Sequence, residues 1–337
     1  MKILVPILNK NSGSVVYFQS LKNQLGLQGV SMELVEFPPC LESTPVLAYV
    51  SFWLRGGMDR FKLVHSNADY GVAFKTSNKP FIVTVHHNVV DERYRQSTNL
   101  AQRVYHYGLM KGRLCRALKE ADRVIAVSYS TKSSLERNLR AKNVEVIYNG
   151  IDTVLFTPKR IAVPARFAGK IRLLFVGNLT KRKGADLLPL IMKRLGNDYV
   201  LFYTAGLQSK ASFKAQNMIP CGVKSRYDLV NLYNTCDILL FPSRLEGFGY
   251  AVAEAMACGK PVVCTNGSSL PELVIDESGG LLCEQDNADD FIDKVRALSR
   301  NEQLRQSMGE FNRERIVNKF GLTQMGASYA RLYQQFV

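Results

Sequence analysis

The sequence predicts an α/β fold built from two doubly wound, Rossmann-like domains. Short runs of β-branched and other apolar residues alternate with longer stretches of helical periodicity, and this alternation restarts at Ile171. A chain of 337 residues with 46% hydrophobic content can bury two cores of ordinary domain size. We therefore expect a first domain over residues 1–160 and a second over 170–321, with a last helix from about 322 to 337.

The first domain begins with the apolar run MKILVPIL. This run is too short for a signal peptide and lacks a small-residue cleavage site, so we interpret it as a strand. From 15 to 27, apolar residues recur at helical spacing and predict a helix; they are Tyr17, Phe18, Leu21 and Leu25. Six strands are expected in this domain, centred near Ile3, Met32, Leu63, Ile82, Val124 and Val146.

The second domain repeats the pattern after a linker, Asp152–Gly169, which contains Pro158 and Pro164. Six further strands are expected, centred near Leu174, Phe202, Ile219, Leu240, Val263 and Leu282. Because helical patterns lie between them, these strands should form a second parallel sheet.

The segment FPSRLEGFGYAVAEAMACGKPVV, residues 241–263, is the most informative about chemistry. The preceding apolar run has the composition of a buried strand, which places Glu246 in a loop at the carboxyl end of that strand. Gly247 and Gly249 allow the backbone to approach a ligand, and Tyr250–Cys258 reads as a helix. The start of a helix favours a phosphate oxygen, so the segment predicts anion binding.

Two further features of the second domain bear on ligand binding. Glu254 is the one charged residue in an otherwise apolar helix, where a carboxylate without a partner would be costly. It binds a ligand, or it is held by water or a nearby Arg. In GNLTKRKG, residues 177–184, Lys183 can place a charge on a diphosphate with Arg182 beside it; the alternative is a solvated basic turn. The turn lacks Walker spacing, and the chain has no G-x-G-x-x-G fingerprint.

The 241–263 segment resembles the signature of the retaining GT-B glycosyltransferases of family four, which carry E-x7-E around a Gly-Phe-Gly-type turn. The resemblance continues in order over nearly the whole chain, in KLVHSN (62–67), ADRVIAVS (121–128), VIYNGIDTVLF (146–156) and IRLLFVGNLTKRKGADLL (171–188). It implies a GT-B architecture, with two domains facing a central cleft and a C-terminal helix that crosses back to the first domain.

The resemblance also implies roles for residues of the second domain. Glu254 would accept hydrogen bonds from ribose hydroxyls, and the backbone amides of Tyr250 and Ala251 would meet a phosphate. Glu246, with the amides of Phe248 and Gly249, would hold the sugar ring. Val223 is a candidate for a backbone contact to the base. Asn178 stands where the family often has Arg, so the diphosphate contact would depend on Lys183 and Arg182.

In the first domain, the resemblance assigns Gly13 to a turn that faces the donor phosphate. This chain has Asn11-Ser12-Gly13-Ser14 where many members have paired glycines. His86 would contact a distal hydroxyl of the donor sugar, and His87 is the alternative because neighbours at a strand edge point to opposite faces. His65 is expected to be structural.

The implied reaction is retaining transfer of a sugar from a UDP- or GDP-sugar to an acceptor hydroxyl, with no required cofactor and no metal. The helix dipole and Lys183 would neutralise the departing diphosphate. Glu246 as a covalent nucleophile is an alternative to front-face attack. A nucleotide-sugar epimerase, a phosphorylase and a nucleic-acid-binding protein are competing functions; the chain has no zinc finger or RNP motif, so we expect no nucleic acid partner.

The formal charge of +15 is concentrated in Arg93–Lys142, which holds 12 basic and 3 acidic residues. Within it, Gln102–Lys119 reads as a basic helix with aromatic residues, typical of an interfacial helix. A solvated face is the alternative. We expect a glycan or glycolipid acceptor that is membrane-associated or acidic, as in envelope polysaccharide or lipopolysaccharide biosynthesis, with peripheral contact to an anionic membrane.

The apolar stretch Pro45–Leu54 contains the single tryptophan. We expect it to form a buried helix; the alternatives are a lining for a lipid acceptor or an element that dips into a bilayer. Seven scattered cysteines without metal spacing indicate reduced thiols and a cytoplasmic protein, which could lie at the inner face of the cytoplasmic membrane.

Overall fold

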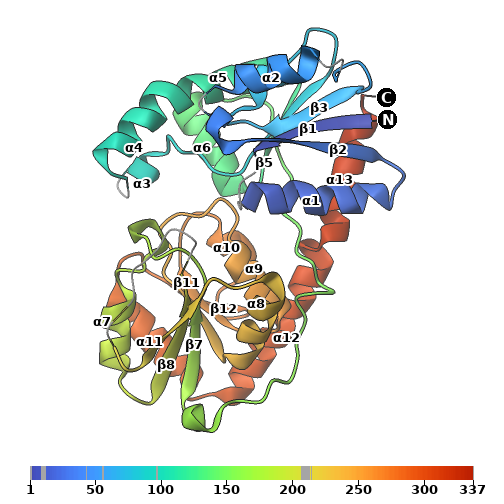
Figure 1. Ribbon diagram of the computed structural model, residues 1–337. Helices are drawn as coiled ribbons and strands as arrows, with labels where there is room; N and C mark the ends of the chain where they lie inside the picture. The colour runs from blue at the N-terminus through green and yellow to red at the C-terminus, as the bar shows by residue number, and fades with distance from the viewer. Residues whose placement is uncertain are drawn as a thin grey trace. The chain divides into compact units, whose positions relative to one another are not determined.

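The computed structural model describes residues 2–8, 13–42, 44–54, 57–95, 98–205, 213 and 215–336. The chain divides into two compact units (Figure 1). Unit 1 comprises Met1–Gly150 and Leu322–Val337, and unit 2 comprises Ile151–Gly321. Each unit is an α/β layer structure around one parallel sheet, which confirms the predicted fold class.

Unit 1 contains six strands among its described residues: β1 (Lys2–Leu8), β2 (Ser31–Phe37), β3 (Leu63–Asn67), β4 (Phe81–Val85), β5 (Arg123–Ala126) and β6 (Val144–Val146). Its helices are α1 (Gly13–Gly26), α2 (Pro45–Leu54), α3 (Glu92–Arg95), α4 (Leu100–Val104), α5 (Lys111–Glu120), α6 (Tyr129–Leu139) and α13 (Leu322–Gln334). Short helical turns are η1 (Pro39–Glu42), η2 (Gly71–Phe74) and η3 (Tyr105–Met110). All six strands occur where the apolar runs predict them.

The sheet of unit 1 has the order β2-β1-β3-β4-β5-β6 with parallel pairing throughout. Side chains alternate along β1, so Ile3, Val5 and Ile7 pack with α1 and α13 on one face. Leu4 points to the opposite face, where it joins a buried cluster with residues of α2 and α5. Both faces are therefore covered, as a doubly wound sheet requires.

A buried polar network joins α13 to the sheet of unit 1. The Tyr17 and Tyr329 hydroxyls are hydrogen-bonded, and Tyr329 contacts Thr84 Oγ1 at 3.0 Å. His65 continues the network, with Nε2 2.8 Å from Thr84 Oγ1 and Nδ1 2.6 Å from the Tyr333 hydroxyl. Burial lowers the pKa of His65 to about 3, so the ring is neutral. This confirms that His65 is structural, and it explains why the last helix belongs to unit 1.

Helix α2 is not the buried helix that its composition predicts. Only Pro45 and Ala48 are buried, and large apolar side chains face outward at Val46, Leu47, Val50, Trp53 and Leu54. Amphipathic periodicity could not reveal this, because both faces of the helix are apolar and the sequence gives no sign of which one packs inward.

The predicted basic helix at 102–119 is a continuous helical run made of α4, the π-helical η3 and α5. Its inner side packs through Met110, Leu114 and Ala117, while Lys111, Arg116 and Lys119 are exposed.

Unit 2 contains β7 (Ile171–Phe175), β8 (Tyr199–Thr204), β9 (Met218–Gly222), β10 (Ile238–Phe241), β11 (Val262–Thr265) and β12 (Gly280–Cys283) among its described residues. Its helices are α7 (Leu188–Leu195), α8 (Arg226–Thr235), α9 (Tyr250–Ala257), α10 (Leu270–Leu273), α11 (Ala288–Ser299) and α12 (Glu302–Lys319), with turns η4 (Ala165–Phe167) and η5 (Lys181–Lys183). The strands again match the predicted positions, and the parallel order is β12-β11-β10-β7-β8-β9.

Residues 151–160, which the sequence analysis assigns to the first domain, lie with unit 2. Arg313 on α12 donates hydrogen bonds to the carbonyl groups of Thr153 and Phe156. Asn234 on α8 accepts from the Lys159 amide at 2.7 Å and donates to the Thr157 carbonyl. These hydrogen bonds hold the connecting segment against α8 and α12 of unit 2.

The seven cysteines all lie within the described residues and have free thiols, as predicted. None of the described helices combines the length and apolar character that crossing a membrane requires.

Candidate functional site

The strand order of unit 2 reverses between β7 and β10. From β7 the chain proceeds through β8 and β9 in one direction, and from β10 through β11 and β12 in the other. Ligands of open parallel sheets bind at the carboxyl ends of the strands at such a switch point. The loops after these two neighbouring strands carry Lys183 and Glu246, which explains how residues 63 positions apart meet.

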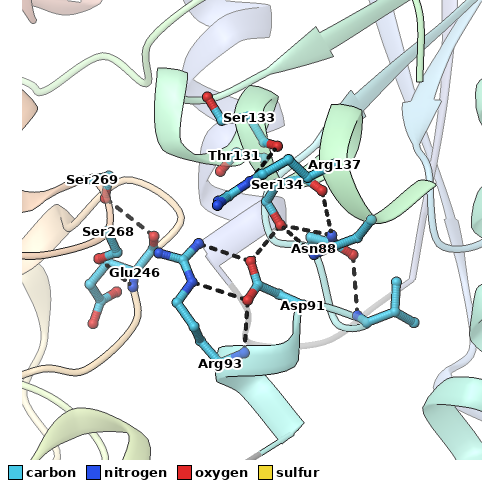
Figure 2. A network of polar contacts seen from close by, with 12 residues as sticks. Asn88, Asp91, Arg93, Thr131, Ser133, Ser134, Arg137, Glu246, Ser268 and Ser269 are labelled. Atoms are coloured by element: carbon cyan, nitrogen blue, oxygen red, sulfur yellow. Dashed lines mark hydrogen bonds and ion pairs between the residues drawn. The ribbon is translucent and has the colours of Figure 1, made fainter. Parts of the chain in front are cut away.

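The Glu246 side chain is 8% exposed and lies in a dense set of donors. Lys183 Nζ is 2.6 Å from Glu246 Oε1, and Ser243 Oγ donates to the same oxygen at 2.5 Å. Arg182 Nη1 lies 3.7 Å from that oxygen. Figure 2 shows the main chain of Glu246 held by two serines that follow β11: the amide donates to Ser268 Oγ, and Ser269 Oγ donates to the carbonyl.

Burial and charge act in opposite directions on this carboxyl group. Burial raises the pKa of Glu246, but the charges of Lys183 and Arg182 and the hydrogen bonds from Lys183 and Ser243 outweigh it, so the pKa lies below its usual value. Burial also lowers the pKa of Lys183, although the Glu246 charge opposes that shift. Glu246 is therefore a carboxylate at neutral pH, and its low pKa favours a charged pair with Lys183.

Two features hold the Lys183 turn in place. Gly184 adopts a φ of +67°, and a Cβ at this position would lie 1.9 Å from the Pro242 carbonyl oxygen, so only glycine permits the approach to the end of β10. Arg244 donates from its backbone amide to the Arg182 carbonyl, and its guanidinium is paired with Asp186 and Asp286. The turn is thus fixed relative to the Glu246 loop.

Helix α9 begins directly after this loop. Gly249 is its N-terminal cap with a φ of +98°, where a Cβ would approach Leu270 to 3.1 Å. The Ala253 amide donates to the Gly249 carbonyl, so Tyr250 and Ala251 lie in the first turn, whose amides point toward the helix start. The Phe248 side chain is buried, 3% exposed, so only its backbone is placed to contact a ligand.

Glu254 has a protein partner that the sequence did not reveal. The buried Tyr233 hydroxyl, on α8, donates to Glu254 Oε2 at 2.9 Å. Within the described part of the chain, Oε1 has no hydrogen-bond partner. Burial raises the pKa of Glu254 to about 7, although the Tyr233 hydrogen bond and the Arg226 charge favour the ionised form. Val223 lies after the edge strand β9 and is 59% exposed.

The residues predicted in the first domain lie at the carboxyl edge of the unit 1 sheet. Gly13 is the first residue of α1, while Asn11 and Ser12 of its turn lie outside the described residues. His86 follows β4, and its ring packs edge-on against Tyr17 with centroids 4.6 Å apart. Burial lowers the pKa of His86 to about 4, and its Nε2 is buried without a hydrogen-bond partner in the described part of the chain. His87 instead packs on Tyr94.

A second polar cluster lies after β4 and was not found from the sequence (Figure 2). Asp91 is 4% exposed and accepts four hydrogen bonds: from the Arg93 amide, Arg93 Nε and Nη2, and Ser134 Oγ. Asn88 Nδ2 donates to Ser134 Oγ at 2.8 Å. Arg93 keeps 40% of its side chain exposed, and its Nη1 has no partner among the described residues. The cluster therefore holds the Arg93 guanidinium in a fixed position through Asp91 while part of it stays exposed.

The sequence analysis does not predict the serines, Tyr233 or this cluster, and among the serines Ser243 alone had a local signal. Ser243, three residues before Glu246, had a local signal because it lies in the same loop. Ser268, Tyr233 and Ser134 come from other strands and helices, and their proximity follows from strand order alone. No group of three or more His, Cys, Asp or Glu side chains in the described ranges is placed to hold a metal ion.

Comparison with known families matches both halves of the chain. Residues 157–315 match the model of glycosyl transferases group 1, and residues 13–155 match that of Glycosyltransferase Family 4. An uncharacterized glycosyltransferase of Methanocaldococcus jannaschii is 32% identical over 65% of this chain and 61% of its own length. The capsular polysaccharide biosynthesis glycosyltransferase CapM of Staphylococcus aureus is 27% identical over 48% of this chain and 46% of its own. The chain thus spans about half to three fifths of these relatives.

Solved structures with the same fold cover the chain almost completely. Sucrose-phosphate synthase from Thermosynechococcus elongatus has a TM-score of 0.87 at 20% identity, covering 99% of this chain and 98% of its own. Anabaena HepE, solved in complex with UDP and glucose, has a TM-score of 0.77 at 18% identity, covering 99% of each chain. At this level of identity, the likeness establishes a GT-B type of fold.

Proposed function

Since the chain belongs to the group 1, family 4 type of glycosyltransferases, we propose that it transfers a sugar from a nucleotide-sugar donor to an acceptor hydroxyl. The observation that carries this proposal is the buried Lys183–Glu246 pair at the switch point of the unit 2 sheet, beside the start of α9. This is an anion site with a carboxylate at its edge, which suits a diphosphate joined to a polyhydroxylated ring.

The donor diphosphate would be bound by Lys183, Arg182 and the first-turn amides of Tyr250 and Ala251. An ammonium has three N–H donors, and Glu246 uses one of those on Lys183, so the others can meet phosphate oxygens. The positive end of α9 adds to this field. Developing charge on the leaving diphosphate is then neutralised by protein groups, which supports transfer without a metal.

Glu254 and Glu246 would divide the recognition of hydroxyl groups. Glu254 Oε1 is available to a ribose hydroxyl while Tyr233 holds the other oxygen. Glu246, with the amides of Phe248 and Gly249, would accept from the sugar ring. Val223 is exposed where its backbone could contact the base.

In unit 1, Gly13 at the start of α1 would face the donor phosphate, and His86 would contact a distal hydroxyl of the sugar. The neutral His86 ring, which packs against Tyr17 on α1, supports the second assignment. His87 packs on Tyr94 and stays the alternative. Retention of anomeric configuration follows from the family resemblance and is part of the proposal. The covalent alternative would need Glu246 to leave its bonds to Lys183 and Ser243.

The acceptor is proposed to be membrane-associated or acidic, as in envelope polysaccharide or lipopolysaccharide assembly. The +9 segment Arg93–Lys142 and the relation to CapM support this class. Arg93, pinned by Asp91 at the carboxyl edge of the unit 1 sheet, is the group we assign to an anionic substituent of the acceptor.

A thermal-shift screen across UDP, GDP and their sugars tests the donor assignment, because a ligand that binds the native state raises the melting temperature. We expect one nucleotide class to stabilise the protein, and Glu246→Gln and Glu254→Gln to abolish turnover of that donor. No stabilisation by any nucleotide, or unchanged transfer in both variants, would contradict the proposal. Release of an altered sugar without an acceptor would identify an epimerase instead.

A further inference from the structure

Helix α2 presents an apolar face that the fold of unit 1 leaves uncovered. The exposed fractions are 60% at Val46, 58% at Leu47, 40% at Val50, 56% at Trp53 and 70% at Leu54. Their spacing of i, i+1, i+4, i+7 and i+8 places them on one side of the helix. The opposite side, with Ala48, Tyr49 and Phe52, packs into the unit.

No charged residue occurs in α2, but the neighbouring helix α5 carries exposed basic residues. Helices α2 and α5 cover the same face of the sheet, since Ala48 and Leu114 belong to one buried cluster (Figure 1). The exposed residues of α5 include Lys111, Arg116 and Lys119. Along the same helical run, further apolar side chains are exposed at Leu100 (76%), Val104 (66%), Tyr105 (37%) and Leu109 (39%).

We propose that the α2 face, Val46–Leu54, inserts into the interfacial layer of an anionic membrane while the basic residues of α5 contact the lipid headgroups. Apolar and aromatic side chains beside Lys and Arg are the combination that lies in a bilayer interface, where tryptophan is favoured. A second copy of this chain fits less well, because pairing two such faces would bring two sets of like charges together. This inference rests on the proposed membrane-associated acceptor and names the surface that reaches it.

Trp53 gives a direct test, because it is the only tryptophan in the chain and lies on this face. Intrinsic fluorescence would be measured with vesicles of phosphatidylcholine alone and of phosphatidylcholine with phosphatidylglycerol. We expect a blue shift with the anionic vesicles and quenching when their acyl chains carry bromine. Vesicle binding with unchanged Trp53 emission, or no binding to anionic vesicles, overturns the proposal.

Matched variants separate insertion from loss of folding. Replacing Leu47→Ser together with Leu54→Ser should weaken vesicle binding by roughly tenfold or more, because two large apolar groups no longer enter the interface. Leu27→Ser is the control, since Leu27 is 82% exposed elsewhere in unit 1 and should leave binding unchanged. Equal binding by the double variant and wild type contradicts the proposal, as does a dimer in sedimentation that the double variant abolishes.

Donor binding distinguishes this proposal from the proposed function. Thermal stabilisation by the preferred nucleotide is measured without lipid, and both Leu variants should keep it. If the nucleotide response is present and insertion is absent, only the membrane surface is refuted; if the nucleotide response is absent in wild type, the donor assignment fails independently.

Discussion

The carboxyl edges of the two sheets carry different kinds of chemistry. In unit 2, Lys183 and Glu246 form a buried ion pair, and serines and Arg244 fix their loops. In unit 1, His86 is neutral and packed on Tyr17, and the charged group is Arg93, pinned by Asp91 yet 40% exposed.

Under the proposed function, this difference corresponds to two tasks, binding the donor and binding the acceptor. A donor diphosphate is chemically constant, so the groups that hold it can be preorganised as a fixed set of charges. An acceptor varies, and its proposed contact in unit 1 is one partly exposed guanidinium, that of Arg93, which fixes fewer of its features. The comparison predicts that changes at Lys183 and Glu246 in unit 2 affect donor use, while changes at Arg93 in unit 1 affect acceptor use. Gly13 and His86 are the unit 1 residues for which we expect an effect on the donor.

The largest effect is expected for Lys183→Met. Losing the ammonium removes charge stabilisation from the departing diphosphate, which should lower kcat by about 10²–10³-fold, and it leaves Glu246 buried without its nearest cation. Donor turnover would be measured at saturating acceptor. Lys181→Met is the control, because Lys181 is exposed in the same turn η5 and should remain close to wild type. Equal losses of kcat in both variants would contradict the assignment of Lys183 to the donor site.

Arg93 tests the other side of the comparison. Arg93→Lys keeps the charge but loses the fork geometry, so the KM for an acidic acceptor should rise by about tenfold while the donor KM stays unchanged. Arg95→Lys, in the same short helix, is the control; its guanidinium lies over the Tyr107 ring. A rise in the donor KM would contradict the division of tasks between the two edges. If neither KM changes, Arg93 does not contact the acceptor and only pairs with Asp91.

The two edges also differ in how much the sequence predicts. The sequence predicts all twelve strand positions, because buried strands are continuous apolar runs. It also proposes Lys183, Glu246 and Glu254 as site residues, because they lie in two contiguous motifs, 177–184 and 241–263. The sequence does not predict Tyr233 beside Glu254, Ser268 beside Glu246 or Ser134 beside Asp91, because the order of the strands brings these residues together. The exposure of α2 was missed because an all-apolar helix gives no pattern from which to tell its two sides apart.

Glu254 should make donor affinity depend on pH. Ribose hydroxyls donate to a carboxylate, and its pKa is about 7, so affinity should rise with pH up to about 7 and level off above it. The slope is at most about tenfold per pH unit. Binding of the preferred nucleotide would be measured calorimetrically from pH 5.5 to 8.5. Glu254→Gln should weaken binding and remove this dependence, whereas Glu310→Gln, an exposed residue on α12, should retain it.

Stability should change with pH in opposite senses in the two units. The folded pKa of Glu254, about 7, lies above the ordinary value of 4.5 for a glutamate, so its contribution to stability is complete below pH 4.5 and is lost as pH rises to 7. The pKa values of His65 and His86, about 3 and 4, lie below 6.5, so their contributions are present above 6.5 and lost on acidification. Each group changes stability by at most about 1.4 kcal/mol per pH unit. Hydrogen exchange would resolve the units, and parallel trends in both would contradict these signs.

The smallest effect concerns the network that joins α13 to unit 1. Tyr333→Phe removes the hydroxyl that contacts His65 Nδ1, leaving a buried ring nitrogen without its partner, which should cost about 1–2 kcal/mol of unfolding free energy. Tyr227→Phe changes a side chain that is 75% exposed and should leave stability unchanged. Because the network contains none of the groups proposed to hold the nucleotide, nucleotide binding should be equal in both variants. A weakened nucleotide response in Tyr333→Phe alone would mean that this network also positions the unit 1 groups proposed to contact the donor.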